Sequence, residues 1–287
     1  MGEIMKYRQI LNCCLIQLSI FFITLTGNAQ TDSRTLMAAE QYEKNRDFRQ
    51  AISIYLDLLD KDVNKAKIYN NLGADYFELG KYDEALISLK RSIEFDPKFE
   101  TAYYNLGTVY SRLGRIAEAI PFLQKAVRFE PSHREARAKL CDAYLGSDQN
   151  RPAIECYEEL LRSTPQDPQS YSNYGVALMH GKRLKEAIVA FETAVRLDPE
   201  GVERFNNLGV VLLNAREYRK AIASFNRALR IEPENEAARY NLAIAYLAGG
   251  NRTAALKQYS FLKGANGDLA RRLFNTIFKG NVIEVKE

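Results

Sequence analysis

Asparagine recurs along this 287-residue chain at the fixed interval that separates Asn71 from Asn105, and its side chain suits one kind of chemistry. The amide carries both a donor and an acceptor, so it can bond the N–H and the C=O of a passing polypeptide backbone. A ladder of such amides would hold an extended peptide with little preference for its sequence. The alternative is a common repeat residue that bonds the adjacent turn. The column reads Met37, Asn71, Asn105, Lys139, Asn173, Asn207 and Asn241.

Residues for catalysis or metal binding do not recur in this way. The sequence has no glycine-rich phosphate loop, nucleophile elbow, CxxC motif or Cys/His cluster. Its two histidines, His133 and His180, lie far apart in the chain, which disfavours a metal or acid–base site. We therefore expect no enzyme activity, no metal and no cofactor. The net charge of +4 is too small for a nucleic-acid-binding protein, so no nucleic-acid partner is expected.

The asparagines belong to a larger internal repeat, and we call their spacing the repeat step. Columns of leucine, of small residues and of bulky residues keep this step, at relative positions i, i+1 and i+4, which lie on one stripe of a first helix. An alanine column and an aromatic or leucine column, four positions apart, form the stripe of a second helix. Small residues on both helices let the two backbones approach closely. The alanine column reads Ala51, Ala85, Ala119, Ala153, Ala187, Ala221 and Ala255.

Turn signals lie between the two helices of each unit. A glycine at this place can take the left-handed conformation that ends a helix. Proline closes the second to sixth units, where it stops the second helix. The turns read Gly80-Lys81, Gly114-Arg115, Gly181-Lys182 and Gly249-Gly250-Asn251.

The segments Tyr103-Tyr-Asn-Leu-Gly107 and Phe205-Asn-Asn-Leu-Gly209 resemble the tetratricopeptide repeat family. The resemblance extends from residue 32 to residue 267. It implies an all-α fold, an α-solenoid in which seven helix–turn–helix repeats form a right-handed superhelix, with a capping helix at the C-terminal end. The repeats within residues 30–267 are predicted at 32–65, 66–99, 100–133, 134–167, 168–201, 202–235 and 236–267.

The C-terminal segment 268–280 is predicted to be that capping helix. Leu269, Leu273 and Ile277 form an apolar stripe that would cover the open end of the seventh repeat. Residues 281–287 are left as a tail.

The resemblance also implies where a ligand lies, because first helices line the concave face in this family. The asparagine column then faces inward, and Tyr104 and Tyr240 are assigned to the same face. A second, apolar feature lies on the first helices of repeats five to seven. It forms either a groove floor or packing between neighbouring helices, and we favour packing slightly. Its residues are Val176, Met179, Val210, Leu213, Ile244 and Leu247.

Residues 1–29 look like a secretory signal peptide. Lys6 and Arg8 precede a short apolar stretch, and Gly27-Asn-Ala29 offers small residues before a cleavage point. The mature protein is therefore expected to be exported, periplasmic or secreted. The alternative is a segment that stays uncleaved and anchors the protein in the membrane, which is the one way we expect a membrane association.

Removal of that segment leaves two cysteines, Cys141 and Cys156, on the two helices of one repeat. Export permits a disulfide between them. We nevertheless favour two reduced, buried thiols.

These features together predict a protein–protein interaction scaffold that binds a peptide or protein in its concave groove. Bacterial envelope assembly or secretion is the role that the resemblance suggests. The alternative is a self-assembling structural protein that forms homo-oligomers through its repeats or its tail.

Overall fold

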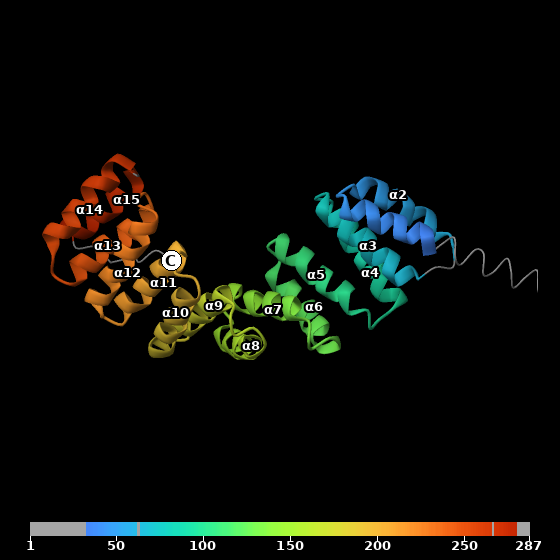
Figure 1. Ribbon diagram of the computed structural model, residues 1–287, viewed down its shortest axis with the longest axis horizontal. Coiled ribbons are helices and arrows are strands. Elements are labelled where there is room, and N and C mark those ends of the chain that lie inside the picture. Colours follow the sequence, from blue (N-terminus) through green and yellow to red (C-terminus); the bar gives the residue numbers. More distant parts are fainter. Residues whose placement is uncertain (1–32, 62–63, 266, 280–287) are drawn as a thin grey trace, which may run out of the picture. The chain divides into compact units, whose positions relative to one another are not determined.

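The computed structural model describes residues 33–61, 64–265 and 267–279, which are helical throughout, with short turns and no strand (Figure 1). The predicted signal peptide and tail lie outside these residues. A first helix covers 33–44. It is followed by α2 (Phe48–Leu59), α3 (Lys65–Glu78), α4 (Tyr82–Phe95), α5 (Glu100–Arg112), α6 (Ile116–Phe129), α7 (Arg134–Gly146), α8 (Asn150–Ser163), α9 (Pro168–His180), α10 (Leu184–Leu197), α11 (Val202–Asn214), α12 (Tyr218–Ile231), α13 (Glu236–Ala248), α14 (Arg252–Ala265) and α15 (Gly267–Lys279).

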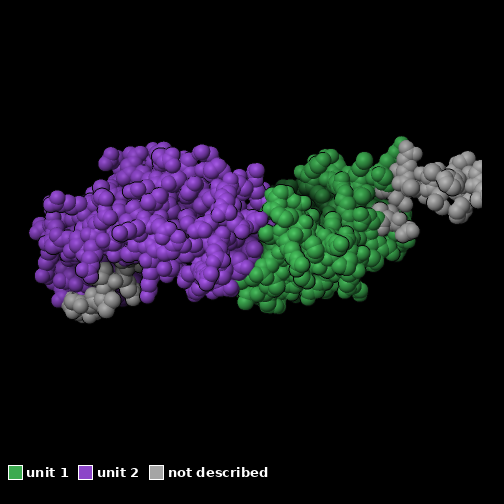
Figure 2. Space-filling view, turned by 90° about the horizontal axis from the view of Figure 1, so that it is seen from below, with its two compact units in different colours: residues 1–133 green, residues 134–287 purple. Residues whose placement is uncertain are grey.

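Consecutive helices pack as pairs. The helix at 33–44 shares a core with α2, and α3 packs on α4, as do the later pairs up to α13 with α14. The chain divides into two compact units, residues 1–133 and 134–287, which Figure 2 shows in green and purple. This succession of helix pairs confirms the all-α fold and the α-solenoid class.

Close backbone contact within each pair explains the small-residue columns. All seven alanines of the second-helix column are fully buried. On the facing first helix, a Cβ atom added to Gly209 would lie 2.5 Å from Cε1 of Phe225, and one added to Gly73 would lie 2.4 Å from Cγ of Leu89. Both distances are far below van der Waals contact, so glycine is required where leucine or phenylalanine fills the space opposite.

We expect Gly209→Ala to lower the free energy of unfolding by about 1–3 kcal/mol, because the new methyl group overpacks the contact with Phe225. Gly264→Ala is the matched control, since a Cβ there meets no atom within 4 Å. That control should be neutral or gain up to about 1 kcal/mol from helix propensity. Urea unfolding measures both. Equal stability of the two variants would contradict the packing explanation.

Every turn between the helices of a pair contains one residue in the left-handed region. Gly80, Gly114 and Gly250 take this role with φ of 73°, 72° and 81°. The prediction for Gly181 is wrong: its φ is −73°, and Lys182 takes the positive value of 61°. The helix α9 continues one residue further than the glycine signal suggested, so the reversal falls on a lysine.

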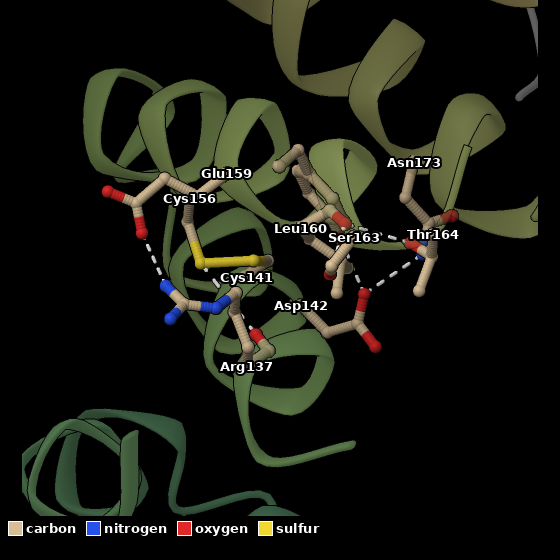
Figure 3. The surroundings of a disulfide bond; sticks show 10 residues. Arg137, Cys141, Asp142, Cys156, Glu159, Leu160, Ser163, Thr164 and Asn173 are labelled. Atoms are coloured by element: carbon tan, nitrogen blue, oxygen red, sulfur yellow. Dashed lines mark hydrogen bonds and ion pairs between the residues drawn. A yellow bond between two sulfur atoms is a disulfide. The ribbon is translucent and has the colours of Figure 1, made fainter. Parts of the chain in front are cut away.

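The expectation of two reduced cysteines is also wrong. Cys141 on α7 and Cys156 on α8 form a disulfide with a Cα–Cα distance of 5.3 Å (Figure 3). Cys141 occupies the small-residue column, and Cys156 precedes the bulky Tyr157 of the facing helix. The close approach that glycine permits elsewhere therefore brings the two sulfur atoms within bonding reach. The ion pair of Arg137 and Glu159 lies beside the bridge.

Candidate functional site: the first-helix face

The first helix of each pair contacts the first helix of the next pair within its unit. In residues 1–133, α3 packs on α5; in residues 134–287, α7, α9, α11, α13 and α15 pack in succession. Columns that recur at the repeat step therefore lie side by side across neighbouring first helices. The predicted asparagine ladder lies on this row, which we call the first-helix face.

In residues 1–133 the asparagine amides donate to groups of the same fold. Asn71 Nδ2 donates to the hydroxyl of Tyr55 at 2.9 Å. Asn105 Nδ2 donates to Oδ1 of Asn70 at 2.9 Å, and Asn70 itself donates to Asn71. The bonds of Asn71 and Asn105 link neighbouring repeats, and the Asn71 bond reaches α2, the second helix of the preceding pair.

In residues 134–287 two further asparagines are engaged in the same manner. Asn173 Nδ2 donates to Oδ1 of Asp142 at 2.9 Å (Figure 3). The same carboxylate also accepts from the hydroxyl of Tyr157. Asn241, which is fully buried, donates to Oδ1 of Asn206 at 3.0 Å. These contacts are with neighbouring helices, so the alternative of bonding to an adjacent turn does not describe them.

Asn207 differs from the other asparagines of the column. Its half-buried amide forms no hydrogen bond to another side chain or to the backbone in the described part of the chain. Asn105 and Asn241 bond the asparagine 35 residues before them, and for Asn207 that place is taken by Ser172. The hydroxyl of Ser172 is buried and also lacks a partner there. The row of interlocking amides is therefore interrupted between α9 and α11.

Asn241→Ala should lower the free energy of unfolding by about 1–3 kcal/mol, because it strips the buried Asn206 carbonyl of its donor. Asn207→Ala, at the equivalent place one repeat earlier, should change it by less than about 0.5 kcal/mol. Thermal melting of the two variants checks this difference. If Asn241→Ala is as stable as the parent protein, the hydrogen bond of Asn241 does not stabilise the fold, and Asn241 does not differ from Asn207 in this respect.

The structure buries most of the predicted apolar set. Ile244 and Val210 are buried, and so are Met179 and Leu213. These positions fit the alternative of packing between helices. Val176 and Leu247 are half-buried, so they keep part of their surface on the face.

The two predicted tyrosines lie in different surroundings. The ring of Tyr104 is half-buried and lies against the ring of His133, with centroids 4.8 Å apart. Tyr240 is buried, and the guanidinium of Arg272 lies 5.8 Å from its ring centroid.

The sequence pattern alone did not single out one buried acid, Asp75. Asp75 is 2% exposed, and its Oδ2 atom has no hydrogen-bond partner among the described residues. Burial, reinforced by the charges of Glu43 and Glu78, raises the pKa of Asp75 to about 8. Burial also raises the pKa of Glu43, which accepts a hydrogen bond from Tyr55 at 2.6 Å. The repeat step would have shown the anomaly, since this column holds the uncharged Gln41 in the first repeat and, in the five later ones, Val109, Ala143, Ala177, Val211 and Ala245.

The C-terminal helix extends the first-helix face. α15 packs on both α13 and α14, as a first helix of a further repeat would. One repeat step from Tyr240, Asn241 and Ile244 leads to Phe274, Asn275 and Phe278. Leu269, Leu273 and Ile277 are buried on its other side. α15 therefore packs against the helix pair before it and continues the columns of the first helices, and the repeat step alone could have shown this second relation.

Two further properties bear on function. Within the described ranges, no three His, Cys, Asp or Glu side chains are grouped so that they could hold a metal ion. In the same part of the chain, no helix is both long and apolar enough to cross a membrane.

Sequence models of the repeat match most of the array. A model described as TPR repeat matches residues 73–114, and models described as Tetratricopeptide repeat match 101–133, 138–202 and 212–273. No curated protein matches the sequence.

Solved structures give the same result at the level of fold. MamA 41-end from Desulfovibrio magneticus RS-1 is 24% identical with a TM-score of 0.58, covering 61% of this chain and 99% of that one. The C-terminal part of a TPR repeat-containing protein from Cytophaga hutchinsonii is 18% identical with a TM-score of 0.64, covering 86% and 96%. YrrB, described as a TPR protein with an unusual peptide-binding site, is 22% identical with a TM-score of 0.54, covering 64% and 96%.

The constant repeat step, the paired helices with small residues at their contact, and four matching repeat models lead to one assignment: the chain belongs to the tetratricopeptide repeat family.

Proposed function

We propose that the protein is a non-enzymatic interaction scaffold that binds an extended segment of a partner protein on the first-helix face of residues 134–287. The observation that carries this proposal is the unengaged amide of Asn207. A half-buried amide without an internal partner retains its donor and its acceptor for a ligand backbone. The half-buried Val176, on the neighbouring helix α9, supplies apolar surface for a side chain of the same ligand.

The proposal assigns ligand binding to fewer asparagines than the ladder predicted from the sequence. Asn71, Asn105 and Asn173 donate to internal acceptors, and Asn241 is fully buried. Asn207 on α11 is therefore the asparagine of the column whose amide remains available to a ligand backbone. Tetratricopeptide repeat proteins are typically non-catalytic interaction scaffolds, and the peptide-binding site named for YrrB supports the choice of a peptide-like ligand.

Export through residues 1–29 is the location that we propose, with a role in bacterial envelope assembly or secretion. The disulfide of Cys141 and Cys156 supports this location, because such bonds persist in oxidising compartments and are rare in reducing ones. Pulse labelling in a bacterial host tests export. A protein that stays in the cytoplasm with residues 1–29 still attached would contradict it.

Affinity capture tests the function. The protein without residues 1–29 and its Asn207→Ala variant are immobilised and exposed to a periplasmic extract. Asn226→Ala is the matched control, since Asn226 is a half-buried asparagine on the second helix α12. We expect the same partner to be retained by the parent protein and by Asn226→Ala, and lost by Asn207→Ala at unchanged melting temperature. Retention by Asn207→Ala would reject the proposed face.

A further inference from the structure

The positive charge of the array is confined to its C-terminal end. Residues 33–235 contain thirty lysines and arginines and thirty aspartates and glutamates, so their net charge is zero. Residues 236–279 contain seven basic residues against two acidic ones, a net charge of +5. The net charge of +4 for the whole chain therefore does not show that residues 236–279 are strongly basic.

Two phenylalanines are exposed at this basic end. Phe274 and Phe278 on α15 are 39% and 49% exposed, and their ring centroids lie 4.6 Å apart. One repeat earlier the same two columns hold Tyr240 and Ile244, which are buried on α13, the helix that packs against α15. In the described part of the chain no second helix follows α15, and the two rings stay accessible.

An unpaired cation lies over one of these rings. The guanidinium of Arg252 on α14 lies 5.0 Å from the centroid of Phe278. This exposed arginine forms no ion pair with any residue of the described ranges. Its column is mostly apolar elsewhere, and comprises Phe48, Tyr82, Ile116, Asn150, Leu184 and Tyr218. The packed ring holds the guanidinium in place and leaves its N–H groups for an external carboxylate.

Asn275 completes this group of residues. It continues the asparagine column between the two phenylalanines, and like Asn207 it has no hydrogen-bond partner among the residues described. We refer to Arg252, Phe274, Asn275 and Phe278 as the terminal aromatic site. It presents two aromatic rings, a free amide and a positive charge on neighbouring helices.

We propose that the terminal aromatic site binds an acidic peptide segment that carries apolar side chains. The carboxylates of the peptide are attracted by the net charge of +5 of residues 236–279 and pair with Arg252. The apolar side chains of the peptide pack on Phe274 and Phe278. The amide of Asn275 forms hydrogen bonds with the peptide backbone. A second copy of this chain is a poorer partner, because its basic end repels and its residues 33–235 have no net charge. A lipid surface would use the rings and the charge but leave the amide of Asn275 without a backbone to bond.

This inference deepens the proposed function and rests on it, since it names the chemistry of the partner and the end at which the partner is anchored. Its residues lie on α14 and α15, away from Asn207 on α11. The two proposals can therefore fail separately.

Fluorescence anisotropy with two labelled peptides of roughly a dozen residues tests the inference. The first peptide repeats Asp-Leu-Glu-Phe, and the second replaces every acid with lysine. We expect the first to bind at least about tenfold more tightly, and its affinity to fall as salt is raised. The double variant Arg252→Gln, Phe278→Ser should lose about tenfold in affinity for the acidic peptide.

A matched control exists in residues 1–133, where Lys65 lies 5.8 Å from the ring centroid of the exposed Phe95. The double variant Lys65→Gln, Phe95→Ser should bind the acidic peptide as the parent protein does. Circular dichroism melting verifies that both double variants are folded. An Asn275→Ala variant, which removes the half-buried amide alone, provides a milder test of the same site.

Equal binding of the two peptides, or equal loss in the two double variants, would overturn the inference. Sedimentation with phosphatidylglycerol vesicles forms a further arm, and binding to vesicles without binding to the acidic peptide would also overturn it, in favour of a lipid surface. If capture of the partner still depends on Asn207 while the acidic preference is absent, the proposed function stands alone. If neither dependence is seen, both proposals fail.

Discussion

Asp75→Val should raise the free energy of unfolding at pH 7 by on the order of 3 kcal/mol. Asp75 is buried within a column that holds valine or alanine in the five later repeats, and its Oδ2 atom lacks a hydrogen-bond partner in the described structure. Valine fills nearly the same volume without a polar atom to desolvate. Val109 and Val211 show that the fold accepts this side chain at the equivalent places.

The effect depends on pH in a defined direction. Burial and the neighbouring Glu43 and Glu78 raise the pKa of Asp75 to about 8, above its ordinary value of 3.8 in the unfolded chain. Between these two values the folded protein holds a proton that the unfolded chain releases. The stability of the parent protein therefore falls as pH rises from about 4 to about 8, by up to about 1.4 kcal/mol per pH unit, and levels off outside this window.

Urea unfolding at several pH values measures this contribution. The difference between Asp75→Val and the parent protein should be smallest near pH 4 and largest near pH 8. Asp83→Asn is the control, because it removes an exposed carboxylate on α4 that lies outside the buried column. A difference that is constant across this range would mean that Asp75 is ionised in the folded protein.

The fold could be predicted from the sequence because each column records one contact that every repeat must make. A Cβ atom added to Gly73 would lie 3.3 Å from the carbonyl oxygen of Ala85, so the two helices leave room for small residues alone at this crossing. The same demand recurs at every repeat step. Periodicity of this kind requires no knowledge of distant contacts.

The proposed binding site was harder to predict, because the column to which a residue belongs does not show which side chain forms a hydrogen bond with it. Asn207 and Asn241 share a column, yet one is unengaged and the other is buried and bonded. The difference comes from the residue on the preceding first helix, which is Ser172 for the one and Asn206 for the other. The pairing rule becomes visible only after the helices are placed side by side. With that rule, Asn275 and its neighbours on α15 could have been found by one more repeat step.

Removal of the disulfide should lower the free energy of unfolding by about 3 kcal/mol, the value expected when a link across a loop of this length is lost from the unfolded chain. Cys141 and Cys156 are 15 residues apart and connect α7 to α8. Both side chains are buried, so alanine at the two positions removes the covalent bond with little change of polarity.

The double variant Cys141→Ala, Cys156→Ala separates the bond from the packing around it. In the protein without residues 1–29, these are the only cysteines, so thiol titration under denaturing conditions should find none free in the parent and two after reduction. Dithiothreitol should bring the melting temperature of the parent down to that of the double variant and leave the variant itself unchanged. Two titratable thiols in freshly purified, oxidised protein would show that the bond does not form. Since cysteine replaces glycine at this one place in the column, the bond supplies to the fourth helix pair a covalent link where its neighbours rely on close packing alone.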